Sequence, residues 1–157
     1  MRKDYPIFSS DSSNDKTTLH SRHATTRNIG SYLLVLYLKN PVDLYLLKRK
    51  TLFPSGFYIY VGSAMNSLTD RVKRHLKLDK KKKWHIDFLT EYAEIVFCVL
   101  IPKRNKIECN IAKSLNGKIL LEKFGSTDCS CRSHLFYYNT LEDLLEDIEK
   151  ILRKFSL

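Results

Sequence analysis

Two tyrosines and a downstream group of cationic side chains are the residues in this sequence best suited to chemistry on a phosphate. Tyr60 lies near the end of a strand-like run, and Arg71, Arg74 and His75 follow it at helical spacing. Tyr32 lies at the start of an earlier apolar run. Phosphodiester cleavage needs a group that deprotonates the attacking water, cations for the transition-state charge and a metal site. The pattern therefore predicts a nuclease-like site built by two strands and one helix.

The strands that carry these tyrosines are expected to pair in an antiparallel sheet. Apolar runs at 32–38, 42–47 and 57–61 each predict a strand, with turns at Asn40-Pro41 and Pro54-Ser55-Gly56. Such short connections leave no room for crossover helices. We therefore expect these three strands to form one antiparallel sheet.

The cationic residues are expected on a helix that begins at a capping box. Ser67 is followed three residues later by Asp70, which is typical of a helix start. Leu68, Val72 and Leu76 recur every four residues. This spacing predicts one buried face and, on another flank, a cationic face.

Further helices and strands are expected to complete an α+β fold with a small antiparallel sheet flanked by helices. A basic loop spans 79–83, and Thr140 with Asp143 repeats the capping-box pattern before a C-terminal amphipathic helix. Gly117 is the expected stop of the helix that carries Glu108. The predicted helices are 84–92, 107–115 and 140–157, and the predicted strands are 95–101 and 135–138.

Composition predicts one basic domain. A chain of 157 residues with 43% hydrophobic content can form one core and is short for two. Residues 1–28 are polar and weakly periodic, which predicts a disordered tail before a domain at 29–157. The net charge is +10, and residues 29–139 carry all of it, because the tail (+2) and the final helix (−2) cancel. This distribution favours a polyanionic partner, although a solvated lysine surface would give the same sum.

Neither a membrane span nor a secretion signal is predicted. No apolar run reaches the roughly 18 residues that a span requires, so we expect a soluble, cytoplasmic protein with no membrane partner. The cysteines are too few and too unevenly spaced for a secreted disulfide scaffold, which favours reduced thiols. They are Cys98, Cys109, Cys129 and Cys131.

The order of motifs resembles the GIY-YIG nuclease superfamily, and within it a branch of small uncharacterised GIY-YIG-like domain proteins. The resemblance covers about residues 29–138. It implies a metal-dependent endonuclease that acts on DNA, in repair or recombination, with a repair protein as a further partner. The motifs are Gly30-Ser31-Tyr32, Tyr60-Val61-Gly62-Ser63-Ala64, Arg74-His75, Trp84-His85-Ile86-Asp87, Glu108-Cys109, and Gly125-Ser126 through Asp128-Cys129 to His134-Leu135.

One departure from the superfamily concerns the distance between the tyrosine motifs. A tight hairpin separates them in well-studied members, whereas 27 residues lie between Tyr32 and Tyr60 here. Either an extra strand is inserted, or Gly56-Phe57-Tyr58 is the true first motif. We favour the insertion, because Tyr58 and Tyr60 share one strand and leave no turn between them. That both tyrosines reach one site is then an assumption.

The resemblance implies catalytic roles residue by residue. One of Tyr32 and Tyr60 would activate water, and because a phenol titrates near pH 10, it would need nearby cations or a bound metal. Arg71 would make bidentate contacts to the scissile phosphate. His75 would reach the same phosphate or assist proton transfer, and His85 resembles a second site histidine. Without the resemblance, these would be strand aromatics, a solvated arginine and half-buried helix residues.

The resemblance also implies metal and substrate ligands. Glu108 would bind one Mg²⁺ or Mn²⁺ ion, because such an ion keeps most of its waters and shares substrate oxygens. Taken alone, Glu108 would be a solvated glutamate. DNA is the expected substrate, with RNA not excluded. The expected substrate-binding residues are Gly62, Ser63, Arg74, Lys80, Lys81, Lys82 and Lys83.

A cysteine-rich segment offers a separate metal hypothesis. Cys129, Cys131 and His134 would need one more ligand, either Cys109 or Asp128, to hold structural zinc. A Cys-x-Cys pair is not a standard zinc knuckle, so we expect these cysteines to pack the segment beside the site. Alternatively, Ser126, Asp128 and His134 would form a third wall of the site.

Two other classes of function fit the same sequence. A nucleic-acid-binding module would keep the fold and the basic face without chemistry, and a zinc-bearing adaptor would serve structure alone. Magnesium-dependent nicking would support the enzyme. Salt-sensitive binding without cleavage would support the module, and stoichiometric zinc would support the adaptor.

Overall fold

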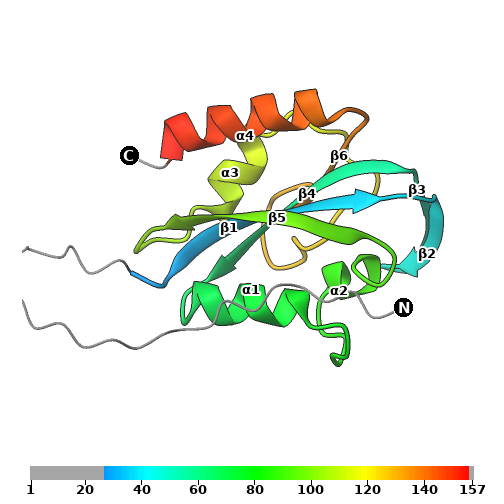
Figure 1. Cartoon of the computed structure of the whole chain (residues 1–157), viewed down its shortest axis with the longest axis horizontal. Helices are drawn as coiled ribbons and strands as arrows, with labels where there is room; N and C mark the ends of the chain where they lie inside the picture. Colours follow the sequence, from blue (N-terminus) through cyan, green and yellow to red (C-terminus); the bar gives the residue numbers. More distant parts are fainter. Residues whose placement is uncertain (1–26, 156–157) are drawn as a thin grey trace, which may run out of the picture.

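The computed structural model describes residues 27–155, which form an α+β fold in three layers (Figure 1). Its elements are β1 (Gly30–Leu38), β2 (Val42–Leu46), β3 (Arg49–Phe53), β4 (Gly56–Ala64), α1 (Leu68–Leu76), α2 (His85–Leu89), β5 (Glu94–Pro102), α3 (Glu108–Ser114), β6 (Leu135–Tyr138) and α4 (Leu141–Phe155). A four-stranded antiparallel sheet in the order β5-β1-β4-β6 lies in the middle. Helices α3 and α4 cover one face, and α1 and α2 cover the other. The expected fold class is confirmed.

The two central strands are buried on both faces. Along β1, Leu34 and Leu36 pack with α1 and α2, whereas Leu33 and Val35 pack with α3 and α4. A strand with apolar contacts on both sides has a continuous apolar sequence rather than an alternating one. The strands that carry the site tyrosines are therefore fixed from both sides.

The segment between the tyrosine motifs folds as a β-hairpin. Strand β1 pairs with β4 from Gly30 opposite Ala64 to Leu38 opposite Gly56, and β2 pairs with β3 in a separate sheet. The predicted sheet of 32–38, 42–47 and 57–61 is therefore wrong in its pairing. The reason is an extra strand at 49–53, which was not predicted from the sequence. An insertion between the motifs is confirmed, with two strands instead of one.

Helix α1 has the predicted start but a different buried face. The Ser67 hydroxyl accepts a hydrogen bond from the Asp70 amide at 3.1 Å. His75 is only 2% exposed and faces the sheet with Leu68, whereas Leu76 is 52% exposed. Residues seven apart lie on the same side of a helix, and a polar partner in the sheet accommodates the histidine. The predicted split into an apolar and a cationic face is therefore wrong for His75 and Leu76.

The ends of the described chain are joined to the fold by hydrogen bonds. Asn28 caps α1, because its carbonyl accepts from the Leu68 amide at 2.8 Å and its side chain accepts from the Thr69 amide at 3.1 Å. Thr140 caps α4 through the Asp143 amide at 3.2 Å, as predicted. The disordered tail predicted at 1–28 lies, up to residue 26, outside the described residues. Within 27–155, no helix is both long enough and apolar enough to cross a membrane.

Candidate active site and metal centre

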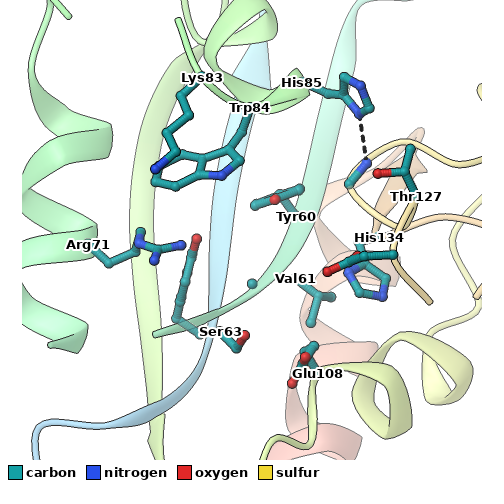
Figure 2. Close-up of a pocket in the computed structure, with 14 residues that line it drawn as sticks. Tyr60, Val61, Ser63, Arg71, Lys83, Trp84, His85, Glu108, Thr127 and His134 are labelled. Atoms are coloured by element: carbon teal, nitrogen blue, oxygen red, sulfur yellow. Dashed lines mark hydrogen bonds between the residues drawn. The ribbon is translucent and has the colours of Figure 1, made fainter. Parts of the chain in front are cut away.

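A cavity of about 340 Å³ opens beside β4, next to the first residue of β6. Strand β6 pairs with β4 as far as Tyr60, and the Val61 amide then donates to the His134 carbonyl at 2.9 Å. Beyond that point the edge of β4 is uncovered, so side chains from both faces of the sheet meet around it (Figure 2). Eight predicted site residues line the cavity, namely Tyr32, Tyr60, Gly62, Ser63, Arg71, Lys83, His85 and Glu108.

The two tyrosines reach the same cavity, as the sequence analysis assumed. Their ring centroids lie 6.5 Å apart. Tyr32 sits opposite Gly62 in the sheet, and a Cβ atom at Gly62 would lie 2.3 Å from the Tyr32 hydroxyl oxygen. A Cβ at Gly125, where φ is +70°, would lie 2.7 Å from the Tyr60 ring. These glycines therefore give the two rings the space they occupy.

Behind Tyr32 lies His75, which does not line the cavity. The Tyr32 hydroxyl and the His75 Nε2 atom are 2.7 Å apart. Burial raises the pKa of Tyr32, and burial together with the charge of Lys80 lowers the pKa of His75 to about 4. Both groups are thus neutral near pH 7 and share one hydrogen bond. Of the two predicted roles of His75, this position fits proton transfer and not a phosphate contact.

A cationic wall, formed by Arg71, Lys83 and Trp84, makes one side of the cavity. The Arg71 guanidinium carbon lies 4.4 Å from the centroid of the Trp84 ring, and the Lys83 ammonium lies 5.1 Å from it. Figure 2 shows Arg71 entering from α1 and pointing towards the middle of the cavity. Trp84 has no predicted role from the sequence, although an aromatic residue between a basic run and an arginine helix is a signal for cation–π contacts.

Arg74 supports this wall from behind instead of lining the cavity. Its guanidinium donates to both carboxylate oxygens of Asp87, at 3.0 and 2.8 Å. Burial alone would raise the pKa of Asp87, but hydrogen bonds from Arg74 and from two backbone amides outweigh it and lower the pKa to about 2. Arg74 also lines the basic groove next to the cavity, so its substrate contact stays a prediction, with the fork engaged by Asp87 in this structure.

The predicted lysine run divides into residues with different surroundings. Lys80 donates to the His75 carbonyl at 2.7 Å, and Lys82 pairs with Glu91 at 2.7 Å. Of the four lysines, Lys83 alone lines the cavity, whereas all four line an adjoining basic groove. The lysines therefore share one groove but differ in the internal contacts that their ammonium groups make.

His85 joins α2 to the loop on the far side of the cavity. Its Nδ1 atom accepts a hydrogen bond from the Gly125 amide at 3.1 Å, drawn as the dashed line in Figure 2. Burial lowers the pKa of His85. The neutral ring consequently carries its proton on Nε2.

An acidic wall, formed by Glu108, Asp128 and His134, makes the other side of the cavity. The Oε2 atom of Glu108 is buried and has no hydrogen-bond partner among the described residues. A hard divalent cation prefers carboxylate oxygens and retains water. A buried, unpartnered carboxylate oxygen in a polar cavity that a second carboxylate also lines fits one Mg²⁺ or Mn²⁺ ion.

Next to the acidic wall, four side chains form a thiol cluster that could hold a metal ion. The ligand atoms of Cys109, Cys129, Cys131 and His134 all lie within 4.8 Å of one another. The His134 Nε2 atom is 3.9 Å from the Cys109 sulfur and 3.6 Å from the Cys129 sulfur. Zinc bonds of roughly 2.3 Å to sulfur and 2.0–2.1 Å to nitrogen would place those atoms about 3.6 Å apart in a tetrahedron.

Two features of the thiol cluster bear on the sequence-based expectations. Burial, followed by the neighbouring thiols, raises the pKa of Cys109, so a cation is needed to favour the thiolate form. The fourth side chain is Cys109, one of the two candidates, and not Asp128. Cys98 lies apart from the cluster on β5 and packs against the core.

Comparison with known proteins identifies the family. The chain matches the family described as "Domain of unknown function DUF123" over residues 31–157, and it therefore belongs to that family. No curated protein and no solved structure matches it significantly. The matched span contains both walls of the cavity and the thiol cluster.

Proposed function

We propose that this DUF123 family member is a metal-dependent endonuclease that hydrolyses phosphodiester bonds in DNA, with a GIY-YIG-type site and a role in repair or recombination. One observation carries the proposal. A single cavity contains Tyr32 and Tyr60 from the sheet, Arg71 from the helix on one face and Glu108 from the helix on the other. Those groups are the base, the cation and the metal ligand that the reaction requires.

Phosphate binding is assigned to Arg71 and to the open edge of β4. Contact with the Trp84 ring limits the orientations of the Arg71 guanidinium, so less entropy is lost when it makes two hydrogen bonds to a phosphate. The Val61 amide points to the β6 side of β4, and the two-residue alternation of an antiparallel strand directs the Ser63 amide to the same side. Since β6 ends before Ser63, that amide is available to a phosphate oxygen.

Proton transfer is assigned to Tyr32 with His75 behind it. For Tyr32 to accept the proton of water, its own hydroxyl proton must move to the His75 Nε2 atom, 2.7 Å away. The raised pKa of Tyr32 and the lowered pKa of His75 both oppose this step in the resting protein. The charge of Arg71 lowers the pKa of Tyr32 in part, and a cation near Glu108 would lower it further.

The metal of the reaction is assigned to the acidic wall. Glu108 would hold Mg²⁺ or Mn²⁺, with Asp128 as a second carboxylate of the same wall. A bound ion of this kind supplies positive charge at the scissile phosphate and lowers the pKa of water.

Zinc is the ion that we propose for the thiol cluster. Three cysteines and one histidine make a closed ligand set that is typical of structural zinc. The proposal replaces the sequence-based preference for packing alone. We also propose a cytoplasmic location. Free cysteines stay reduced in the cytoplasm, and all four cysteines are free in this structure. Purified protein should therefore contain one zinc ion per chain.

The test of the enzyme proposal is a cleavage assay in Mg²⁺ or Mn²⁺. Full-length protein is given flap, junction, single-stranded and duplex DNA, together with matched RNA. Glu108→Gln should abolish cleavage and largely preserve DNA affinity, because it removes a metal ligand and no phosphate contact. Glu146→Gln, at an exposed position of α4, is the matched control and should cut as the parent does.

The same assay separates the rival functions. If the parent cuts nothing, or if Glu108→Gln cuts as well as the parent, the enzyme proposal fails. Salt-sensitive binding without cleavage would then identify a nucleic-acid-binding module with this fold.

A further inference from the structure

We infer that metal bound by the thiol cluster positions the acidic wall of the cavity, so that zinc loading controls the affinity of the Glu108 site for its catalytic cation. The inference rests on the proposed role of Glu108. It goes further, because it gives the cluster a positioning role in addition to stabilising the fold.

Sequence adjacency links the cluster to the wall. Glu108 precedes Cys109 in α3, and Asp128 precedes Cys129 in the loop that lines the cavity. Consecutive Cα atoms are only about 3.8 Å apart. His134 belongs to both sets, since it lines the cavity and directs Nε2 at the thiols. Each residue of the acidic wall is thus a ligand of the cluster or the immediate neighbour of one.

Little regular secondary structure belongs to the loop part of this wall. Helix α3 has seven residues, and β6 starts only at Leu135. Between them, residues 115–134 consist of turns, bends and one isolated bridge from Lys118 to Tyr137. The Lys123 ammonium donates to the carbonyls of Cys129 and Cys131, at 3.0 and 3.1 Å, which gathers the loop around the thiols.

The carboxylate of Glu108 is weakly anchored. Among residues 27–155, its buried Oε2 atom has no hydrogen-bond partner. Four metal–ligand bonds would fix the start of α3, the loop and the start of β6 relative to one another. The position of Glu108 relative to Asp128 would then depend on those bonds.

The test measures the binding of Mn²⁺ in the absence of DNA, so it requires no cleavage activity. Trp84 is the single tryptophan of the chain and lines the cavity, so quenching of its fluorescence by Mn²⁺ reports binding. Cys129→Ser should lower the zinc content and raise the Mn²⁺ dissociation constant by about ten- to a hundredfold, as loss of a metal's supporting groups does. Cys98→Ser is the matched control, because Cys98 is a free cysteine outside the cluster, and it should change neither value.

A second measurement covers the case in which zinc loss unfolds the protein. Hydrogen–deuterium exchange is recorded on the full chain before and after one equivalent of chelator. Faster exchange confined to residues 108–134, with β1 and β4 unchanged, supports the inference. A uniform rise would make the metal a general stabiliser of the fold and overturn the inference.

Failure of this inference can be distinguished from failure of the proposed function. If zinc removal leaves the Mn²⁺ dissociation constant unchanged while Glu108→Gln raises it, the positioning role is wrong and the catalytic site stands. If zinc-loaded Glu108→Gln binds Mn²⁺ as tightly as the parent, the catalytic metal site is wrong. A chain purified with no zinc, whose Mn²⁺ affinity zinc addition does not change, would also overturn the positioning role.

Discussion

The two walls of the cavity are held in place by different physical means. The cationic wall stands on α1 and α2, where Trp84 stacks against Arg71 and Arg74, and a buried ion pair to Asp87 joins the two helices. The acidic wall stands on a seven-residue helix and a loop, and four metal-ligand side chains gather behind it. The first wall is supported by packing and ion pairing, whereas the second has a metal-ligand cluster in the corresponding place.

This difference indicates which wall needs a bound ion to fix the position of its side chains. A guanidinium that stacks on an indole and faces a cavity has its position before any ligand arrives. A carboxylate with no hydrogen-bond partner lacks such preorganisation, and a bound ion must supply it. We therefore expect changes in the cationic wall to act on rate and DNA affinity, and changes in the acidic wall to act through metal.

Replacement of Arg71 should have the largest effect on the cationic wall. Arg71→Ala should lower the cleavage rate by about a hundred- to a thousandfold, roughly 2.7–4 kcal/mol, as expected for a cation acting mainly on transition-state charge. The Mn²⁺ affinity of the acidic wall should stay unchanged. Arg71→Lys keeps the charge but loses the planar fork, so it should recover only part of the rate. A variant that loses Mn²⁺ affinity as well would show that the walls are not independent.

The fold was predictable from sequence where its signals are local. The strand at 135–138 and the caps at Ser67 and Thr140 follow from short patterns, and the structure has all three. Strand β3 was missed because Arg49 and Lys50 are exposed there and give no apolar alternation. Its hairpin turn has positive φ at Leu47 and Lys48, residue types that do not indicate such a turn.

The site was predictable as a set of residues but not as a geometry. Tyr32, Tyr60, Arg71 and Glu108 follow from ordered motifs, yet their meeting in one cavity depends on where β6 begins beside β4. Their chemical roles stay predictions. His75 was assigned to a cationic face because the spacing of apolar residues along a helix does not reveal a long-range partner. That partner is the Tyr32 hydroxyl, which hydrogen-bonds with the buried histidine. Cys109 lies 20 residues before Cys129, so no spacing rule singles it out as the fourth ligand.

Acid should weaken the fold through His75 behind the cationic wall. Its pKa falls from 6.5 to about 4, chiefly through burial and the charge of Lys80, with Asp87 opposing. The unfolded chain therefore binds the proton more readily than the folded chain does. The stability that neutral His75 contributes is fully present above pH 6.5 and is lost as the pH falls to 4. The loss should reach at most about 3 kcal/mol.

Urea unfolding at pH 7, 5.5 and 4 measures this loss. His75→Gln keeps an acceptor for the Tyr32 hydroxyl and does not titrate, so its stability should fall less over the same range. His85 and His134 also have lowered pKa values and should account for the remaining slope. Equal slopes for parent and variant would contradict the role of His75.

The smallest effect is expected from the lysines beside the cationic wall, and it concerns salt dependence. All four lysines line the basic groove. The first pair is Lys81 and Lys83, of which Lys83 also lines the cavity, and the second pair is Lys80 and Lys82, which are engaged with the His75 carbonyl and Glu91. If the first pair contacts phosphates, Lys81→Ala with Lys83→Ala should reduce the logarithmic salt slope of duplex binding by up to about 0.9 per lost contact. Lys80→Ala with Lys82→Ala is the matched control and should change the slope less. Equal reductions by both pairs would show that Lys80 and Lys82 exchange their internal contacts for DNA. An unchanged slope for both pairs would show that the whole run is a solvated loop.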